Sequence, residues 1–233
     1  MSRPLILAPA TVTQQPKQYG GVSAGIRPAL ILLGSAPALN LANNKPFTRY
    51  NWTLADGVDV DGNIVQGTGY TTSICDPAGS TNGSSFVCII RFKNTTSHNG
   101  GHLMTGKTSS QVANGFMASI KSNPDTLELN GGDAATFGNL SVIGLGAADG
   151  KYRTLVVQFL GATASAAYNG RYIGSVTVVA AGANPSGLAV LNYAAGASVD
   201  SGNPTDSSVS LAAVLIGKYD IVSLSANPWQ IFR

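Results

Sequence analysis

Two histidines have the spacing of a metal-binding pair. His98 and His102 lie four positions apart, which on a helix would place both imidazoles on one face. Residues 99–101 read Asn-Gly-Gly, which is typical of a loop. Because no cysteine, aspartate or glutamate lies next to the pair in the sequence, we predict a polar loop and no metal site.

Three closely spaced aspartates form a second group that could bind a cation. Asp56, Asp59 and Asp61 give an oxygen-rich segment that resembles a calcium-binding loop. The segment lacks the ligand spacing and the terminal glutamate of an EF-hand. We therefore predict a polar turn with its carboxylates in solvent and no cofactor, and calcium binding is the alternative.

Carboxylates that could hydrolyse a glycosidic bond are scarce. Such an enzyme needs two facing carboxyl groups, one as acid and one as base or nucleophile. Glu128 is the only glutamate in the chain, and its neighbours Leu127 and Leu129 are apolar. We therefore predict that the protein is not an enzyme.

Aromatic side chains could instead bind a sugar without catalysing a reaction. Glycan binding needs exposed rings and polar groups that converge on loops. Aromatic residues of a β-sandwich more often belong to its core, and that alternative stays open for each of them. The candidates for glycan contact are Trp52, Tyr168, Tyr172 and Tyr193, together with Tyr70.

The elements that position these residues are predicted to be short strands. Apolar and β-branched runs alternate with turn residues about every 8 to 15 positions from residue 47 onward, which is typical of a sandwich. Asn169-Gly170 between two such runs indicates a hairpin with a type I′ turn. The sequence therefore predicts an all-β, antiparallel β-sandwich of the jelly-roll type. Strands are expected over residues 85–92, 102–105, 115–120, 126–129, 140–145, 152–159, 164–168, 171–176, 188–193, 208–216 and 219–222.

Three of these segments carry a resemblance to a known family. The order of residues 150–157, 167–173 and 213–216 resembles the concanavalin A-like and laminin-G-like jelly rolls. The likeness covers residues 85–233, and more loosely 47–84. The string Ser-Leu-Ser-Ala-Asn-Pro-Trp-Gln-Ile-Phe over residues 223–232 is similar to the ends of lectin-like proteins of tailed bacteriophages. The resemblance implies a phage protein with a lectin-like domain.

That C-terminal string also has a physical interpretation. Pro228 cannot continue a strand ladder, and Trp229, Ile231 and Phe232 are large apolar groups near the chain end. We expect this end to be pinned to the sandwich, and a free anchor for a partner is the alternative.

Residues 1–46 differ from the predicted lectin-like domain, residues 47–233. Six prolines interrupt the segment, which nonetheless contains many apolar residues. We predict an extended arm that docks on another protein, and edge strands that complete the chain's own sandwich are the alternative. The predicted docking residues are Leu5, Ile6, Leu7, Val12, Ile26, Leu30, Ile31 and Leu32.

Composition narrows the classes of partner. Charged residues make up 11% of the 233 residues, against roughly 25% in an average soluble domain, so part of the surface is expected to face other protein. A net charge of +3 without a basic run argues against nucleic acid. The apolar runs are too short for a signal peptide or a membrane span. Cys75 and Cys88 are predicted to be free thiols, as in a protein assembled in a reducing cytoplasm.

These features predict a structural protein of a bacteriophage virion. It would decorate the capsid or belong to the tail, form a homo-oligomer, and dock through its arm on major capsid or tail proteins. It would be assembled in the cytoplasm of the host. The alternative is an adhesin that recognises a glycan of the host surface.

Overall fold

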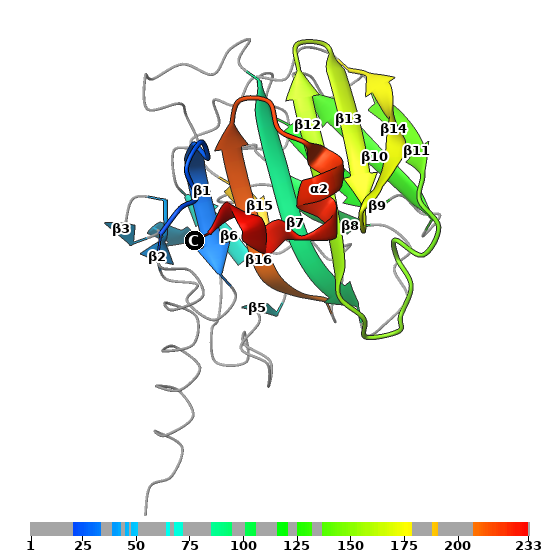
Figure 1. The fold of residues 1–233 in the computed structure, drawn as a ribbon. Coiled ribbons are helices and arrows are strands. Elements are labelled where there is room, and N and C mark those ends of the chain that lie inside the picture. The colour runs from blue at the N-terminus through cyan, green and yellow to red at the C-terminus, as the bar shows by residue number, and fades with distance from the viewer. Residues whose placement is uncertain are drawn as a thin grey trace, which may run out of the picture.

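The computed structural model describes the strands of a sandwich and the segments that cover it (Figure 1). The described residues are 21–33, 39–42, 45–46, 48–50, 64–65, 68–71, 85–94, 101–105, 116–120, 125–131, 137–178, 188–190 and 207–232. Two antiparallel sheets pack face to face, and the predicted jelly-roll sandwich is confirmed. Within these ranges no helix is long and apolar enough to cross a membrane.

The front sheet brings the chain's first and last described strands together. Its order is β1–β16–β7–β12–β13–β14, and every neighbouring pair is antiparallel. The strands are β1 (Pro28–Leu33), β16 (Ser207–Ile216), β7 (Phe86–Asn94), β12 (Arg153–Leu160), β13 (Thr163–Tyr168) and β14 (Arg171–Thr177), and β5 (Ile64–Val65) also pairs with β16.

The back sheet has the order β11–β10–β9–β8–β15–β6–β4. Its strands are β11 (Phe137–Ser141), β10 (Thr126–Gly131), β9 (Phe116–Ile120), β8 (Gly101–Thr105), β15 (Leu188–Val190), β6 (Thr68–Thr71) and β4 (Thr48–Tyr50). A separate pair is formed by β2 (Leu39–Asn40) and β3 (Lys45–Pro46).

Alternation along the strands builds the inner core between the sheets. On β7, Phe86, Cys88, Ile90 and Phe92 all point inward and are buried. The Phe86 ring lies 5.0 Å from the Phe159 ring, and Phe116 of the back sheet lies 5.3 Å from Phe86 (centroid distances). Burial of each such ring contributes roughly 1.5–3 kcal/mol of stability. Cys88 is a free buried thiol, as predicted.

The outer face of the front sheet carries a second apolar cluster, covered by the C-terminal segment. Helix α2 (Ile221–Ala226) and the 3-10 helix η1 (Pro228–Ile231) cross this face toward β1 (Figure 1). Ile231 is fully buried there, and Phe232 forms a bridge with Val22. The expectation that this end is pinned to the sandwich is confirmed. Together α2 and η1 are called the C-terminal strap below.

The strand predicted over residues 219–222 is wrong, because a helix begins there. The Asp220 carboxylate accepts hydrogen bonds from the backbone N–H groups of Val222 and Ser223, both at 3.1 Å. Such an N-cap satisfies donors that a helix start leaves unpaired. Asp220 therefore directs the chain into α2.

Strand β1 also corrects the arm prediction. Leu30, Ile31 and Leu32 are fully buried, and β1 pairs with β16 of the same sheet. Their predicted role in docking on a partner is therefore wrong, and the alternative of a strand in the chain's own sandwich is correct for residues 28–33. Ile26 is half-buried against the outer cluster of that sheet. Leu5, Ile6, Leu7 and Val12 lie outside the described residues.

Candidate functional site

A pocket opens where the turn after β11 meets the hairpin of β13 and β14. It encloses about 230 Å³, which is below the roughly 300–1,000 Å³ typical of drug-sized ligands. Its size therefore suits a single small unit of a larger ligand. The pocket, called the hairpin pocket below, is lined by Ser141, Val142, Ile143, Tyr168, Arg171, Tyr172 and Ile173.

The hairpin turn sets one wall of this pocket. Asn169 and Gly170 have φ values of 48° and 82°, so the type I′ turn predicted from their sequence is supported. Asn169 is fixed to Thr154, whose backbone N–H donates to the Asn169 side-chain oxygen at 2.8 Å. The Gly170 N–H donates to Ser225 Oγ at 2.9 Å, so the C-terminal strap also holds the turn.

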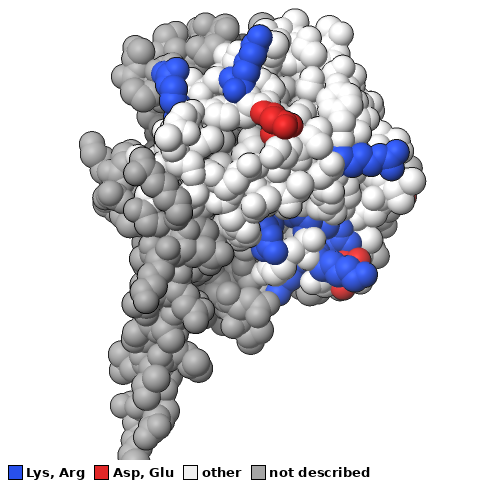
Figure 2. Space-filling model, viewed as in Figure 1, with Lys and Arg blue, Asp and Glu red and all other residues white. Residues whose placement is uncertain are grey.

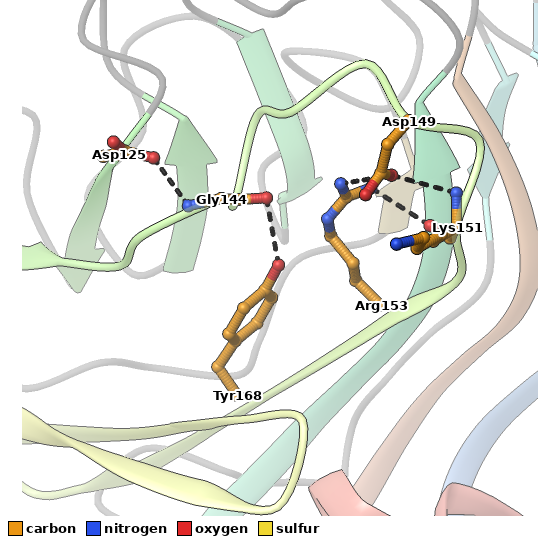
Figure 3. A network of polar contacts seen from close by, with 6 residues as sticks. All are labelled: Asp125, Gly144, Asp149, Lys151, Arg153 and Tyr168. Atoms are coloured by element: carbon orange, nitrogen blue, oxygen red, sulfur yellow. Dashed lines mark hydrogen bonds and ion pairs between the residues drawn. The ribbon is translucent and has the colours of Figure 1, made fainter.

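The turn over residues 143–146 contributes Ile143 to the other side of the pocket, and Figure 3 shows the hydrogen bonds that fix this turn. The Gly144 N–H donates to Asp125 Oδ1 at 2.6 Å, and the Tyr168 hydroxyl donates to the Gly144 carbonyl at 3.1 Å. Gly144 has a φ of 77°, which glycine adopts without strain. The strand predicted over residues 140–145 is therefore wrong beyond Ser141, because Asp125 and Gly144 bend the chain into a turn.

An ion pair supports the segment that follows this turn. The Arg153 guanidinium, which is nearly buried, donates to Asp149 Oδ1 at 2.6 Å and to the Lys151 carbonyl at 3.0 Å (Figure 3). The Asp149 carboxylate also accepts the Lys151 N–H at 3.0 Å. The backbone hydrogen bond from Lys151 and the adjacent Arg153 lower the pKa of Asp149. This carboxylate is therefore engaged in holding the loop.

Tyr168 is the polar group that joins the two walls. Partial burial raises its pKa to about 12, because the ionised phenolate would lose solvation. The hydroxyl therefore stays protonated at neutral pH and can donate to Gly144. Its ring forms part of the pocket wall.

Two glycines let β11 and β14 approach each other beside the pocket. A Cβ on Gly138 would collide with the Val176 side chain. A Cβ on Gly174 would lie 2.9 Å from Leu140 Cδ2, and Gly174 also has a φ of 143°. Both positions therefore need glycine to keep the two sheet edges in contact.

The pocket presents exposed apolar groups next to a cation. Ile143 is 86% exposed and Tyr172 is 51% exposed, although large apolar groups usually avoid water. Within the described residues, the exposed Arg171 guanidinium has no ion-pair partner, and no carboxylate lines the pocket. The described lining therefore offers stacking and hydrogen bonding.

The structure brings together two of the predicted glycan residues, Tyr168 and Tyr172. Trp52 and Tyr193 lie outside the described residues, and Tyr70 is described only as a backbone position of β6. Ile143 was not predicted, because the fold of the turn at 143–146 depends on the distant Asp125. Arg171 and Ser141, which lie in β14 and β11, were not predicted either.

Candidate metal and catalytic residues are not assembled in the described structure. His102 lies in β8, while His98, Cys75 and the aspartates Asp56, Asp59 and Asp61 lie outside the described residues. Within the described ranges no group of three or more potential metal ligands occurs. Glu128 lies in β10 of the back sheet, where it pairs with Asn139 of β11.

One sequence pattern typical of hydrolases has a structural role here. Residues 21–25 read Gly-Val-Ser-Ala-Gly, which fits the Gly-x-Ser-x-Gly pattern of a nucleophile elbow between a strand and a helix. Here an isolated bridge precedes Ser23 and strand β1 follows it. The Ser23 hydroxyl lies 2.9 Å from the Gln230 carbonyl and 2.7 Å from that of Phe232. It therefore ties the C-terminal strap to the start of the described chain.

Comparison with known proteins shows the fold. No family model matches the chain, and no curated protein matches it. The CBM40 domain of a Ruminococcus gnavus IT-sialidase, bound to α2,3-sialyllactose, is 12% identical with a TM-score of 0.51. The match covers 70% of this chain and 95% of that domain.

Two larger proteins contain a similar domain. The binding domain of Botulinum neurotoxin DC, in complex with rat synaptotagmin II, is 11% identical with a TM-score of 0.60 over 88% of this chain and 52% of that one. The K499G mutant of the NanB sialidase of Streptococcus pneumoniae is 13% identical with a TM-score of 0.51. That match covers 87% of this chain and 28% of the sialidase. At these identities the likeness establishes the jelly-roll fold alone.

Proposed function

We propose that this chain is a non-catalytic carbohydrate-binding protein and that its ligand binds in the hairpin pocket. The observation that carries the proposal is the placement of exposed Tyr172 and Ile143 beside the Arg171 guanidinium. This arrangement supports the glycan-binding alternative of the sequence analysis more than docking on virion proteins.

The chemistry of the pocket matches that of a sugar. A pyranose ring has apolar C–H faces that pack on aromatic and aliphatic groups, and the Tyr172 ring and the Ile143 side chain supply both. Sugar hydroxyls both accept and donate hydrogen bonds. Arg171, Ser141 and the hydroxyl of Tyr172 can serve as their partners. The turn and the hairpin are fixed before any ligand binds, so little conformational entropy would be lost on binding.

The comparisons add support at the level of fold. A domain of similar fold is known in complex with a sialylated sugar, and we extend glycan binding to this chain as a proposal. The test is an array of glycans probed with the full-length chain, including neutral oligosaccharides and both sialyllactoses. We expect selective binding that disappears in a Tyr172→Ala variant. If the folded protein binds no glycan on the array, the proposal is rejected.

We also propose that the protein acts on the surface of a bacteriophage virion. The observation in its favour is the string over residues 223–232, which resembles the ends of phage lectin-like proteins and here forms the C-terminal strap. A glycan-binding subunit at the tail would fit both proposals, with assembly in the host cytoplasm. Mass spectrometry of purified particles should detect the chain, and its absence from particles would reject this assignment.

A further inference from the structure

The outer face of the front sheet changes from apolar to cationic side chains along β7. Val87 and Ile89 belong to the outer apolar cluster beneath the C-terminal strap. Arg91 and Lys93 follow on the same face, because alternate residues of a strand point the same way. Trp229 of η1 marks the border, since its ring centroid lies 5.5 Å from Arg91 Cζ. The outer face of β7 therefore carries two half-buried cations beyond the edge of the strap.

Aromatic and polar contacts hold these cations in place. Arg91 Cζ lies 3.8 Å from the centroid of the Tyr152 ring, and Lys93 Nζ lies 5.3 Å from the same centroid. Arg91 Nη1 also donates to Ser210 Oγ at 2.7 Å. These side chains are already ordered, so a ligand that binds them loses less affinity to side-chain entropy.

The same region gains a further positive charge from the loop before β12. Lys151 is exposed and adjoins Tyr152 in the sequence. Asp149 is the described acid of this loop, where it pairs with Arg153 at 2.6 Å and also interacts electrostatically with Lys151. Figure 2 shows Lys and Arg side chains gathered at the lower right of the described surface, with acidic atoms at the edge of the group. Arg91, Lys93, Lys151, Tyr152 and Trp229 are called the cationic face below.

We propose that the cationic face is a second binding site, which takes the sulfate or carboxylate groups of an acidic polysaccharide. The proposal rests on the proposed function only in assigning the ligand to carbohydrates. Guanidinium and ammonium groups bind such anions through charge-assisted hydrogen bonds, and the half-buried Tyr152 and Trp229 offer apolar surface to sugar rings. The face carries a few clustered cations rather than the extended basic track that follows a nucleic-acid backbone.

The experiment measures binding of the full-length chain to dextran sulfate, with unsulfated dextran of the same length as the control ligand. The variant Lys93→Gln/Lys151→Gln removes two charges of the face. The matched control is Lys218→Gln, which removes an exposed cation near the start of the strap. Thermal unfolding should show that all three proteins are equally folded.

We expect dextran sulfate to bind, dextran not to bind, and the double variant to lose about tenfold or more in affinity. Its binding should also depend less steeply on salt, because fewer counterions are displaced. Lys218→Gln should bind as the unaltered chain does. An unchanged affinity of the double variant, an equal loss in the Lys218 variant, or equally tight binding of duplex DNA would overturn the proposal.

Tyr172→Ala separates the two sites. This variant should keep its affinity for dextran sulfate while losing the glycan bound in the hairpin pocket. If no array glycan binds, but dextran sulfate binding is lost in the double variant alone, the proposed function of the hairpin pocket fails and the cationic face stands.

Discussion

Tyr172 supplies an exposed aromatic ring to the binding surface that we assign to the hairpin pocket. Half of its surface is exposed, on an edge strand that also carries Arg171. An exposed tyrosine of this kind contributes little to the stability of the fold. Its apolar ring and its hydroxyl are instead available to a ligand. Tyrosine is common in binding sites because it combines an apolar ring with a polar end.

Replacing Tyr172 with alanine should therefore weaken glycan binding without unfolding the protein. We expect an affinity loss of about tenfold or more, equivalent to about 1.4 kcal/mol, and a stability change within about 0.5 kcal/mol. Isothermal titration and thermal unfolding measure the two quantities. Leu160→Ala is the matched control, because Leu160 is an exposed apolar residue at the end of β12, outside the pocket. Equal affinities for Tyr172→Ala and the unaltered chain would contradict this role.

Tyr168 predicts a pH dependence of stability. Its pKa is raised to about 12 in the folded chain, so the folded state keeps the proton that the unfolded chain releases near pH 10. The stabilisation is complete below about pH 10 and is lost as the pH rises toward 12. Tyr168→Phe should remove this difference and, at neutral pH, destabilise the fold by about 0.5–1.5 kcal/mol through loss of the bond to Gly144. Denaturant unfolding from pH 8 to 12 provides the comparison, and parallel pH profiles of both proteins would refute it.

At the scale of the elements, the pocket depends on two sheet edges that meet through glycines. Gly138→Ala should destabilise the chain by about 1–3 kcal/mol and weaken glycan binding, because its Cβ would push β14 away from β11. Gly161→Ala is the control, since Gly161 also sits in a strand connection, with a φ of 56° and open space around its Cα. We expect that control to lose stability through backbone strain while keeping its affinity. Glycan titration of both variants measures the two affinities. Equal affinities would contradict the dependence of the pocket on contact between the two sheet edges.

The C-terminal strap is the element that covers the outer apolar cluster. Ile231→Ala should destabilise the protein by about 2–5 kcal/mol, because Ile231 is fully buried and its loss leaves a cavity. Gln230→Ala, at an exposed neighbouring position, should change stability by no more than about 0.5 kcal/mol. Urea unfolding of the two variants tests whether the strap belongs to the folded unit. Similar urea midpoints for the two variants would show that the strap is not part of the folded unit.

The sequence predicts the strands well where the pattern is local. The alternation around Phe86–Asn94 and the Asn169-Gly170 turn are properties of neighbouring residues, and both were found close to where they were expected. The turn at 143–146 was missed because its geometry depends on Asp125, 19 residues before Gly144. Helix α2 was missed because Ile221-Val222 has the apolar, β-branched pattern of a strand, and the Asp220 cap and the sheet beneath it override that preference.

At the scale of the whole molecule, β1 makes residues 28–33 of the N-terminal segment part of the sandwich. Its side chains face both clusters, since Leu30 and Leu32 lie in the inner core and Ile31 and Leu33 in the outer one. The apolar and proline-rich composition that predicted a docking arm therefore has a different cause over residues 28–33. A strand buried on both faces needs a continuous apolar run.

Deletion of residues 1–46 should consequently abolish cooperative folding, whereas deletion of residues 1–20 should preserve it together with glycan binding. The longer deletion removes β1 and leaves the buried edge of β16 without its partner. The shorter one retains every described contact, including the bridge of Val22 with Phe232. Circular dichroism during thermal unfolding provides the measurement. A cooperative transition in the longer deletion would mean that β1 is dispensable.

The position of a bound glycan on the sandwich is the direct test of the hairpin pocket as a sugar site. Nuclear magnetic resonance of the labelled full-length chain, titrated with a glycan selected on the array, reports which backbone amides the ligand approaches. We predict that the largest shifts fall on residues 141–144 and 171–173, around the exposed Tyr172 ring. Shifts that gather elsewhere on the sandwich, with these signals unmoved, would contradict the assignment of the hairpin pocket as the sugar site.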